Sequence, residues 1–127
     1  MQRSIKFRYI FEDKKGTKHT LTLGIEDIET FSDIPRNLRE GWKLLARDEY
    51  TGLKDKKVTE IYEDDQVIQV LLGEHDANIP DDIFEGVVVW DTNGWAIKGH
   101  DGRIETSLMP CDKYTQVNII GNVHEGI

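Results

Sequence analysis

The feature that most limits the fold of this chain is a series of short apolar runs with a period of two, separated by clusters of turn-forming residues. In residues 5–10, Ile5, Phe7 and Tyr9 fall on one side of an extended chain, and mostly polar side chains fall on the other. Residues 19–25 resume this alternation after a turn that contains a glycine. The two runs predict an N-terminal β-hairpin.

Four further stretches have the length and composition of strands. Residues 42–50 alternate apolar and polar side chains and predict one strand. Residues 66–72 are an apolar run bounded by acids and a glycine, which predicts a central strand buried on both faces. Residues 85–99 hold two β-rich runs joined at Asp-Thr-Asn-Gly, a sequence typical of a tight hairpin. Residues 116–125 predict a last strand with Gly121 as a bulge.

About seven short strands, few helix signals and no internal repeat predict a mainly β fold. We expect a small antiparallel barrel or strongly bent sheet, SH3-like or barrel-like, with an N-terminal hairpin. At most one short helix is expected, capped by Ser32 or Asp33. The whole chain, 1–127, is expected to be a single domain, with residues 1–48 as hairpin and connector and residues 49–127 as a barrel-like core.

Cysteine usage and apolar run lengths bear on the compartment. Cys111 is the only cysteine, so no disulfide can form within the chain. A lone thiol and an N-terminal segment without a continuous apolar run predict a protein of the reducing cytoplasm. No window approaches the apolar length that a membrane span requires, so no membrane partner is expected.

Charge is distributed unevenly along the chain. Residues 1–57 hold 13 Lys/Arg and 10 Asp/Glu, a net charge of +3, whereas residues 58–127 hold 3 and 14, a net charge of −11. An acidic surface repels nucleic acid and other anions and keeps a chain soluble. The two halves could also attract each other, within one chain or head to tail between chains.

Residues 50–67, YTGLKDKKVTEIYEDDQV, resemble the central motif of the YopX family of small phage and prophage proteins. In that family the motif runs Tyr-Thr-Gly-Leu-Lys-Asp-Lys, an Asn-Gly turn, then Glu-Ile-Tyr-Glu-Gly-Asp and a hydrophobic strand. The resemblance extends over residues 5–125, and within the motif these residues carry it: Tyr50, Thr51, Gly52, Leu53, Lys54, Asp55, Lys56, Glu60, Ile61, Tyr62, Glu63 and Asp65. The resemblance implies a fold type, a phage origin and a bacterial host cell, and it supplies no catalytic residues.

Two positions depart from the family motif. Lys57 and Val58 stand where the family has Asn-Gly, and the branched Cβ of Val58 resists a positive φ, which counts against a tight turn there. Asp64 replaces the glycine of the Glu-Gly-Asp element. Aspartate tolerates the left-handed conformation better than most residues, so the backbone path is expected to survive.

The residue types of this motif predict a structural connector, with a binding surface as the alternative. Thr51 and Gly52 can bend the chain, Leu53 can anchor it in the core, and residues 54–57 are expected to stay in solvent. The acids at residues 63–65 are expected to tighten a turn before the buried strand, because short carboxylates bond readily to nearby backbone N–H groups.

No motif of a catalytic or cofactor-binding site is present in the sequence. Residues 74–76, Glu-His-Asp, could ligate a metal, but adjacent residues rarely converge on one ion, and a solvated loop explains them more simply. Cys111 with His100 or His124 could form a nucleophile and base, but a free cysteine is usually a small buried hydrophobe. The sequence therefore predicts no catalytic residues, no metal and no cofactor.

We therefore expect a non-enzymatic phage or prophage accessory protein that binds an unknown protein partner, including copies of itself. One alternative is a nucleic-acid-associated module that uses the basic residues of the first half, although the charge of the whole chain counts against phosphate binding. Those residues include Arg3, Lys6, Arg8, Lys14, Lys15 and Lys18. Another alternative is an acidic surface that imitates DNA and occupies a host protein.

Overall fold

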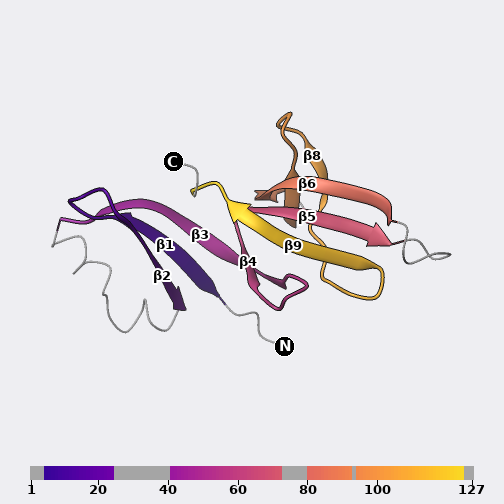
Figure 1. Cartoon of the computed structure of the whole chain (residues 1–127), viewed down its shortest axis with the longest axis horizontal. Coiled ribbons are helices and arrows are strands. Elements are labelled where there is room, and N and C mark those ends of the chain that lie inside the picture. Colours follow the sequence, from indigo (N-terminus) through magenta and orange to yellow (C-terminus); the bar gives the residue numbers. More distant parts are fainter. Residues whose placement is uncertain (1–4, 25–40, 73–79, 93, 125–127) are drawn as a thin grey trace. The chain divides into compact units, whose positions relative to one another are not determined.

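The computed structural model describes residues 5–24, 41–72, 80–92 and 94–124 (Figure 1). The chain divides into two compact units, Met1–Tyr50 and Thr51–Ile127, each of which is described by itself. Throughout the described ranges the regular structure is β-strand, and no described helix is long and apolar enough to cross a membrane. The predicted helix near Ser32 and the acid–histidine cluster at residues 74–76 lie outside these ranges.

Nine strands make up the described residues, and they form two antiparallel sheets that do not close into a barrel. The prediction of a mainly β fold is therefore confirmed. The strands are β1 (Lys6–Glu12), β2 (Lys18–Gly24), β3 (Lys43–Lys54), β4 (Glu60–Tyr62), β5 (Asp65–Leu72), β6 (Pro80–Asp91), β7 (Gly94–Lys98), β8 (Ile104–Ser107) and β9 (Thr115–Asn122).

The first unit is built on β1, which pairs with β2 on one side and with β3 on the other, both antiparallel. The predicted N-terminal hairpin is confirmed, with Lys6 opposite Gly24 at one end and Glu12 opposite Lys18 at the other. The β1–β3 register shifts between Ile10 and Phe11, which is a bulge. β3 then continues past Tyr50 into the second unit.

An aromatic row covers one face of the first unit, as the period of two predicts. Phe7, Tyr9 and Phe11 follow one another along β1 with ring centroids 6.2 and 6.3 Å apart. Trp42 extends the row, since its ring lies 6.2 Å from Phe11 and is stacked on His19 at 4.2 Å. Such contacts add to the free energy that burial of the rings already supplies.

The second unit contains a five-stranded antiparallel sheet in the order β8-β7-β6-β5-β9 (Figure 1). The predicted hairpin between β6 and β7 is confirmed: the two strands pair antiparallel up to Asp91 opposite Gly94, so the glycine already belongs to β7. The predicted bulge in β9 is also confirmed, because Gln66 pairs with Gly121 and the next pair skips one residue of β9.

The core of the second unit lies on one face of this sheet. Besides the sheet, three other segments supply side chains to this core: the end of β3, the short β4 and the segment after β8. The buried residues are Ile61, Val67, Val88, Ile97, Leu108 and Val117, with Leu53, Trp95, Cys111 and Ile119 packed against them. The predicted anchoring by Leu53 is therefore confirmed.

β5 has an interior place between β6 and β9, but burial on both faces was a wrong prediction. Asp65, Val67 and Gln69 on one face are buried, whereas Ile68 and Val70 on the other are only partly buried. An apolar run does not by itself show that both faces of a strand are covered.

Gln69 is fully buried within this core, and both ends of its amide are satisfied. Its Nε2 donates to the carbonyl of Ser107 (3.0 Å), and the backbone N–H of Met109 donates to its Oε1 (2.9 Å). Because an unpaired buried amide would cost free energy, these two bonds fix the segment after β8 against β5.

Candidate interaction surface

The YopX-like motif forms a hairpin between the end of β3 and β4, and Asp55 organises its turn. The backbone N–H of Asp55 donates to the carbonyl of Thr59 (2.8 Å), and that of Val58 donates to the carbonyl of Asp55 (2.9 Å). The Asp55 carboxylate accepts from the N–H groups of Lys57 and Thr59, each at 2.9 Å. This is a three-residue hairpin loop in which one carboxylate replaces the water that the turn amides would otherwise bind.

Both departures from the family motif adopt the backbone that the family's glycines would. Val58 has a φ of 65° and Asp64 a φ of 71°. The survival of the backbone path at Asp64 is confirmed, whereas the expectation that Val58 counts against a tight turn was wrong. The four hydrogen bonds centred on Asp55 impose the turn despite the steric cost of a branched Cβ at positive φ.

The tip of this hairpin closes the outer edge of β9. The Lys56 N–H donates to the carbonyl of Val117 (2.8 Å), and the N–H of Ile119 donates to Asp55 Oδ2 (3.3 Å). Asp55 is buried, with only 6% of its surface exposed, so the expectation that residues 54–57 stay in solvent was wrong for this residue. An edge strand closed in this way offers fewer free backbone groups to another chain.

Two further buried polar residues of the motif, Thr51 and Asp65, bond to backbone groups within the same unit. The buried Thr51 hydroxyl donates to the carbonyl of Ile61 (2.8 Å). The buried Asp65 carboxylate accepts from the N–H of Tyr62 (2.8 Å), and the Tyr62 hydroxyl donates to Glu60 (3.1 Å). The predicted tightening of a turn by an acid before β5 is therefore confirmed at Asp65.

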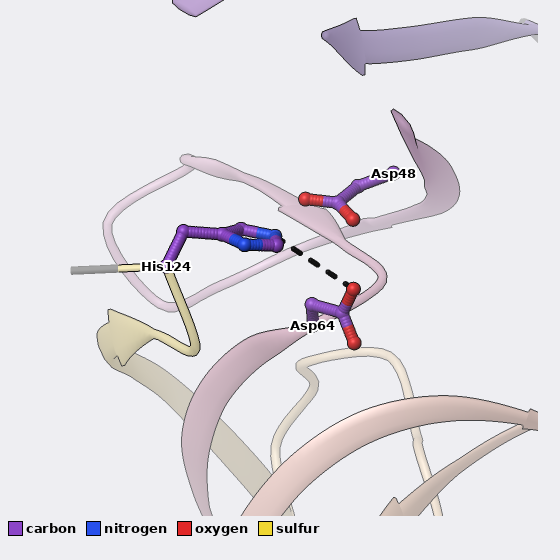
Figure 2. Close-up of side chains that lie close together, drawn as sticks. All are labelled: Asp48, Asp64 and His124. Atoms are coloured by element: carbon purple, nitrogen blue, oxygen red, sulfur yellow. Dashed lines mark ion pairs between the residues drawn. The ribbon is translucent and has the colours of Figure 1, made fainter. Parts of the chain in front are cut away.

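Beside the start of β5, Asp64 and His124 lie together (Figure 2). Their closest side-chain atoms, Asp64 Oδ2 and His124 Nε2, are 3.7 Å apart, and the dashed line in Figure 2 marks this ion pair. The backbone also joins the two segments, since the Val123 N–H donates to the carbonyl of Asp64 (3.0 Å). Asp48, also drawn, belongs to the first unit, where its Oδ2 accepts from Arg8 at 2.8 and 3.1 Å.

Cys111 is engaged by the backbone of β9. The N–H of Val117 donates to its Sγ (3.3 Å), and the thiol lies 3.8 Å from the Val117 carbonyl. The histidines considered as bases have other neighbours: His100 lies 3.3 Å from Glu85, and His124 pairs with Asp64. These contacts of Cys111 are those of a core residue that packs against Val117.

The face of the five-stranded sheet opposite the core is partly exposed and carries apolar side chains together with Gln66, Ser107, Gln116 and Asn118; we term it the open face. Strand pairing places its residues together, because Val70 lies opposite Ile83 and Gln66 opposite Val87. Ile83 is 63% exposed, the Ile104 side chain at the other edge is 45% exposed, and the others are partly buried. Its apolar residues are Ile68, Val70, Ile83, Val87, Val89 and Ile104, together with Ala96, which is buried.

One acidic and one basic side chain lie at the centre of the open face, so its charge is balanced. Across the rows of paired residues from Ile83 to Val89 of β6, the charged side chains on this face are Glu85 and Lys98. Glu85 lies two residues from Val87, which is paired with Lys98. The sequence gives a signal for this face, since Ile83, Glu85, Val87 and Val89 alternate along β6, but only strand pairing shows which neighbours join them.

A family model described as YopX protein matches residues 4–126 of this chain, nearly its whole length. The chain therefore belongs to the YopX family, and the resemblance of its central motif is confirmed. No curated protein and no solved structure matches it.

Proposed function

We propose that this YopX-family chain is a non-enzymatic phage or prophage accessory protein that acts in the host cytoplasm by binding a protein through its open face. One observation carries the proposal: an apolar, charge-balanced sheet face in a chain whose residues 58–127 have a net charge of −11. Contiguous exposed apolar surface of this kind is typical of interaction sites, because a monomer gains nothing from leaving it in water.

The contacts of the buried polar residues support a binding role over catalysis. Thr51, Asp55, Asp65 and Gln69 all bond to backbone groups that turns and strand ends leave unpaired. Catalytic groups are usually held with a free, perturbed atom directed at a substrate. The YopX-like motif accordingly acts as the scaffold that holds the sheet, and the open face acts as the surface that binds.

Affinity capture from host cells that carry the phage, with three forms of the protein, tests this proposal. Ile83→Lys puts a charge in the open face at a position exposed enough to leave the fold intact. Thr22→Lys adds the same charge at an exposed position of β2 and is the matched control. A protein retained by the wild type and the control but lost with Ile83→Lys supports the proposal. Equal capture by all three forms, or by none, contradicts it.

The nucleic-acid alternative depends on a basic face in the first half of the chain. Two of its residues already have other contacts: Arg8 bonds to Asp48, and Lys6 Nζ lies 5.5 Å from the centre of the Tyr50 ring. Lys14 and Lys15 are exposed at the turn between β1 and β2, next to Glu12, which lies between Lys18 and Lys43. A binding titration with DNA and RNA at low and high salt tests this alternative, since phosphate binding must weaken as salt rises.

A further inference from the structure

We propose that the open face is a self-docking surface, on which two copies of the chain pack face to face about a two-fold axis with Glu85 of one copy opposite Lys98 of the partner subunit. The inference rests on the proposed function and names the partner as a second copy. It follows from the extent of the face, its charge and the positions of its two charged residues.

The extent of the face suits a dimer interface. β5 and β9 extend the face beside Ile83–Val87, and β7 and β8 extend it beside Val87–Val89, so with about 4.8 Å between strands and about 3.4 Å per residue it covers on the order of 400 Å² of planar area. Protruding side chains make the accessible surface larger than its planar area. A stable interface of standard size uses about 800 Å² from each partner. Its accessible surface therefore approaches what a dimer interface needs, and sheet faces pack on one another at about 10 Å.

The balanced charge of this face lowers the repulsion between two copies. Each copy has a net charge of −8, so two copies repel each other at most relative orientations. Where one acid and one base balance between apolar side chains, that repulsion is smallest. A two-fold interface uses the same patch on both copies, so a contact between Glu85 of one copy and Lys98 of the partner subunit occurs twice.

The pairing of β6 with β7 places the two charges for such an arrangement. Val87 lies opposite Lys98, and Glu85 lies two residues further along β6 on the same face. An axis that passes between Glu85 and Lys98 brings each acid against the partner's Lys98. His100 already lies 3.3 Å from one Glu85 oxygen, but the Glu85 side chain remains 48% exposed.

Two charge reversals, measured singly and together, test the geometry. Glu85→Lys places two lysines against each other at both symmetry-related contacts, and Lys98→Glu places two acids there. Sedimentation of each variant alone is expected to give the mass of one chain where the wild type and Thr22→Lys give that of two. An equimolar mixture of the two variants is expected to restore the dimer, because both contacts then join opposite charges. Far-UV circular dichroism of each variant checks that the fold is unchanged.

Three outcomes would overturn the inference: a monomeric wild type up to high micromolar concentration, a dimer that both variants retain, or a mixture that stays monomeric. If added salt dissociates the dimer but both variants still form it, head-to-tail attraction between the basic and acidic halves is indicated instead. A monomeric wild type that still captures a protein through Ile83 would overturn self-docking alone and leave the proposed function standing.

Discussion

Two turns of this protein have the same sequence pattern, Asp-Lys-Lys-X-Thr, and the same backbone. In the first unit residues 13–17 connect β1 to β2, and in the second residues 55–59 connect β3 to β4. The Asp13 N–H donates to the Thr17 carbonyl (2.9 Å), and the Asp13 carboxylate accepts from the N–H groups of Lys15 and Thr17. The same bonds surround Asp55. One local rule therefore builds a hairpin in both units.

The two turns differ in the residue that must adopt a positive φ. Gly16 has a φ of 87° and carries no Cβ, whereas Val58 has a φ of 65° and a branched one. A non-glycine residue in this region costs roughly 1–2 kcal/mol. The second turn tolerates that cost, so the hydrogen bonds around its aspartate must outweigh it. The difference shows that the carboxylate, more than the glycine, decides the turn.

The second carboxylate oxygen has a different partner in each turn, so we expect the two aspartates to contribute different amounts to the free energy of unfolding. Asp13 Oδ2 lies 2.9 Å from His19 Nε2, a side chain that is 39% exposed. Asp55 Oδ2 accepts from the N–H of Ile119 in β9 and is buried. The first contact is local and solvated, whereas the second joins the turn to a strand 64 residues away.

The largest expected effect comes from removing the buried carboxylate. Asp55→Ala should lower the free energy of unfolding of the second unit by about 3 kcal/mol, because three backbone N–H groups lose their acceptor and Asp55 is buried. Denaturation followed by fluorescence in a Trp42→Phe background reports on Trp90 and Trp95 of that unit. Asp13→Ala is the matched variant and should cost clearly less; equal losses would show that the link to β9 adds nothing.

A valine placed at position 16 tests the steric cost of a branched side chain in this turn. Gly16→Val should destabilise the first unit by about 2 kcal/mol, because the turn around Asp13 has no buried link to offset a branched Cβ at φ 87°. Amide exchange of the β1–β2 hairpin measures it. Gly16→Asn is the control, since asparagine tolerates this conformation. An unchanged exchange rate in Gly16→Val would mean that the carboxylate alone absorbs the strain.

The reverse change should stabilise the second unit. Val58→Gly removes the steric strain at φ 65° but adds freedom to the unfolded chain, so a net gain of about 1 kcal/mol is expected. Val58 is 70% exposed, so little buried apolar surface is lost. The same fluorescence assay measures the gain, with Val58→Ala as the control that keeps a Cβ. A loss of stability would mean that the valine makes a contact of its own.

The smallest expected effect is a pH dependence confined to the first turn. The hydrogen bond from His19, and then that from the Thr17 N–H, hold the pKa of Asp13 below its ordinary value of 3.8. Since the folded state favours the ionised form, its contribution is present above pH 3.8 and is lost as the pH falls below that value. The stability difference between wild type and Asp13→Asn should therefore shrink in acid. A difference that stays constant down to pH 2 would contradict this cause.

Several features of the fold follow from residues near one another in the sequence. The alternation in β1 and β2 predicts their hairpin, and Asp-Thr-Asn-Gly predicts the connection of β6 to β7. The motif of residues 50–67 predicts the family. The repeated Asp-Lys-Lys-X-Thr pattern also lies in the sequence, but it covers only a five-residue turn and does not mark a repeated fold unit.

Other features depend on partners far along the chain. Nothing near Asp55 shows that Ile119 will donate to it, and a lysine-rich segment looks solvent-exposed when it is considered alone. The burial of Gln69 likewise depends on residues 107–109. Whether the second face of β5 is buried depends on which other elements pack against it. The apolar run of β5 alone does not predict this.

The sequence by itself determined that this chain is β-rich, where it turns and to which family it belongs, because periodicity and turn chemistry act over a few residues. Only the tertiary structure decided which strands are neighbours. That choice places the Asp55 carboxylate against Ile119 and gathers the open face around Glu85 and Lys98. Strand pairing joins residues that are distant in sequence, and its outcome depends on the summed free energy of the whole sheet.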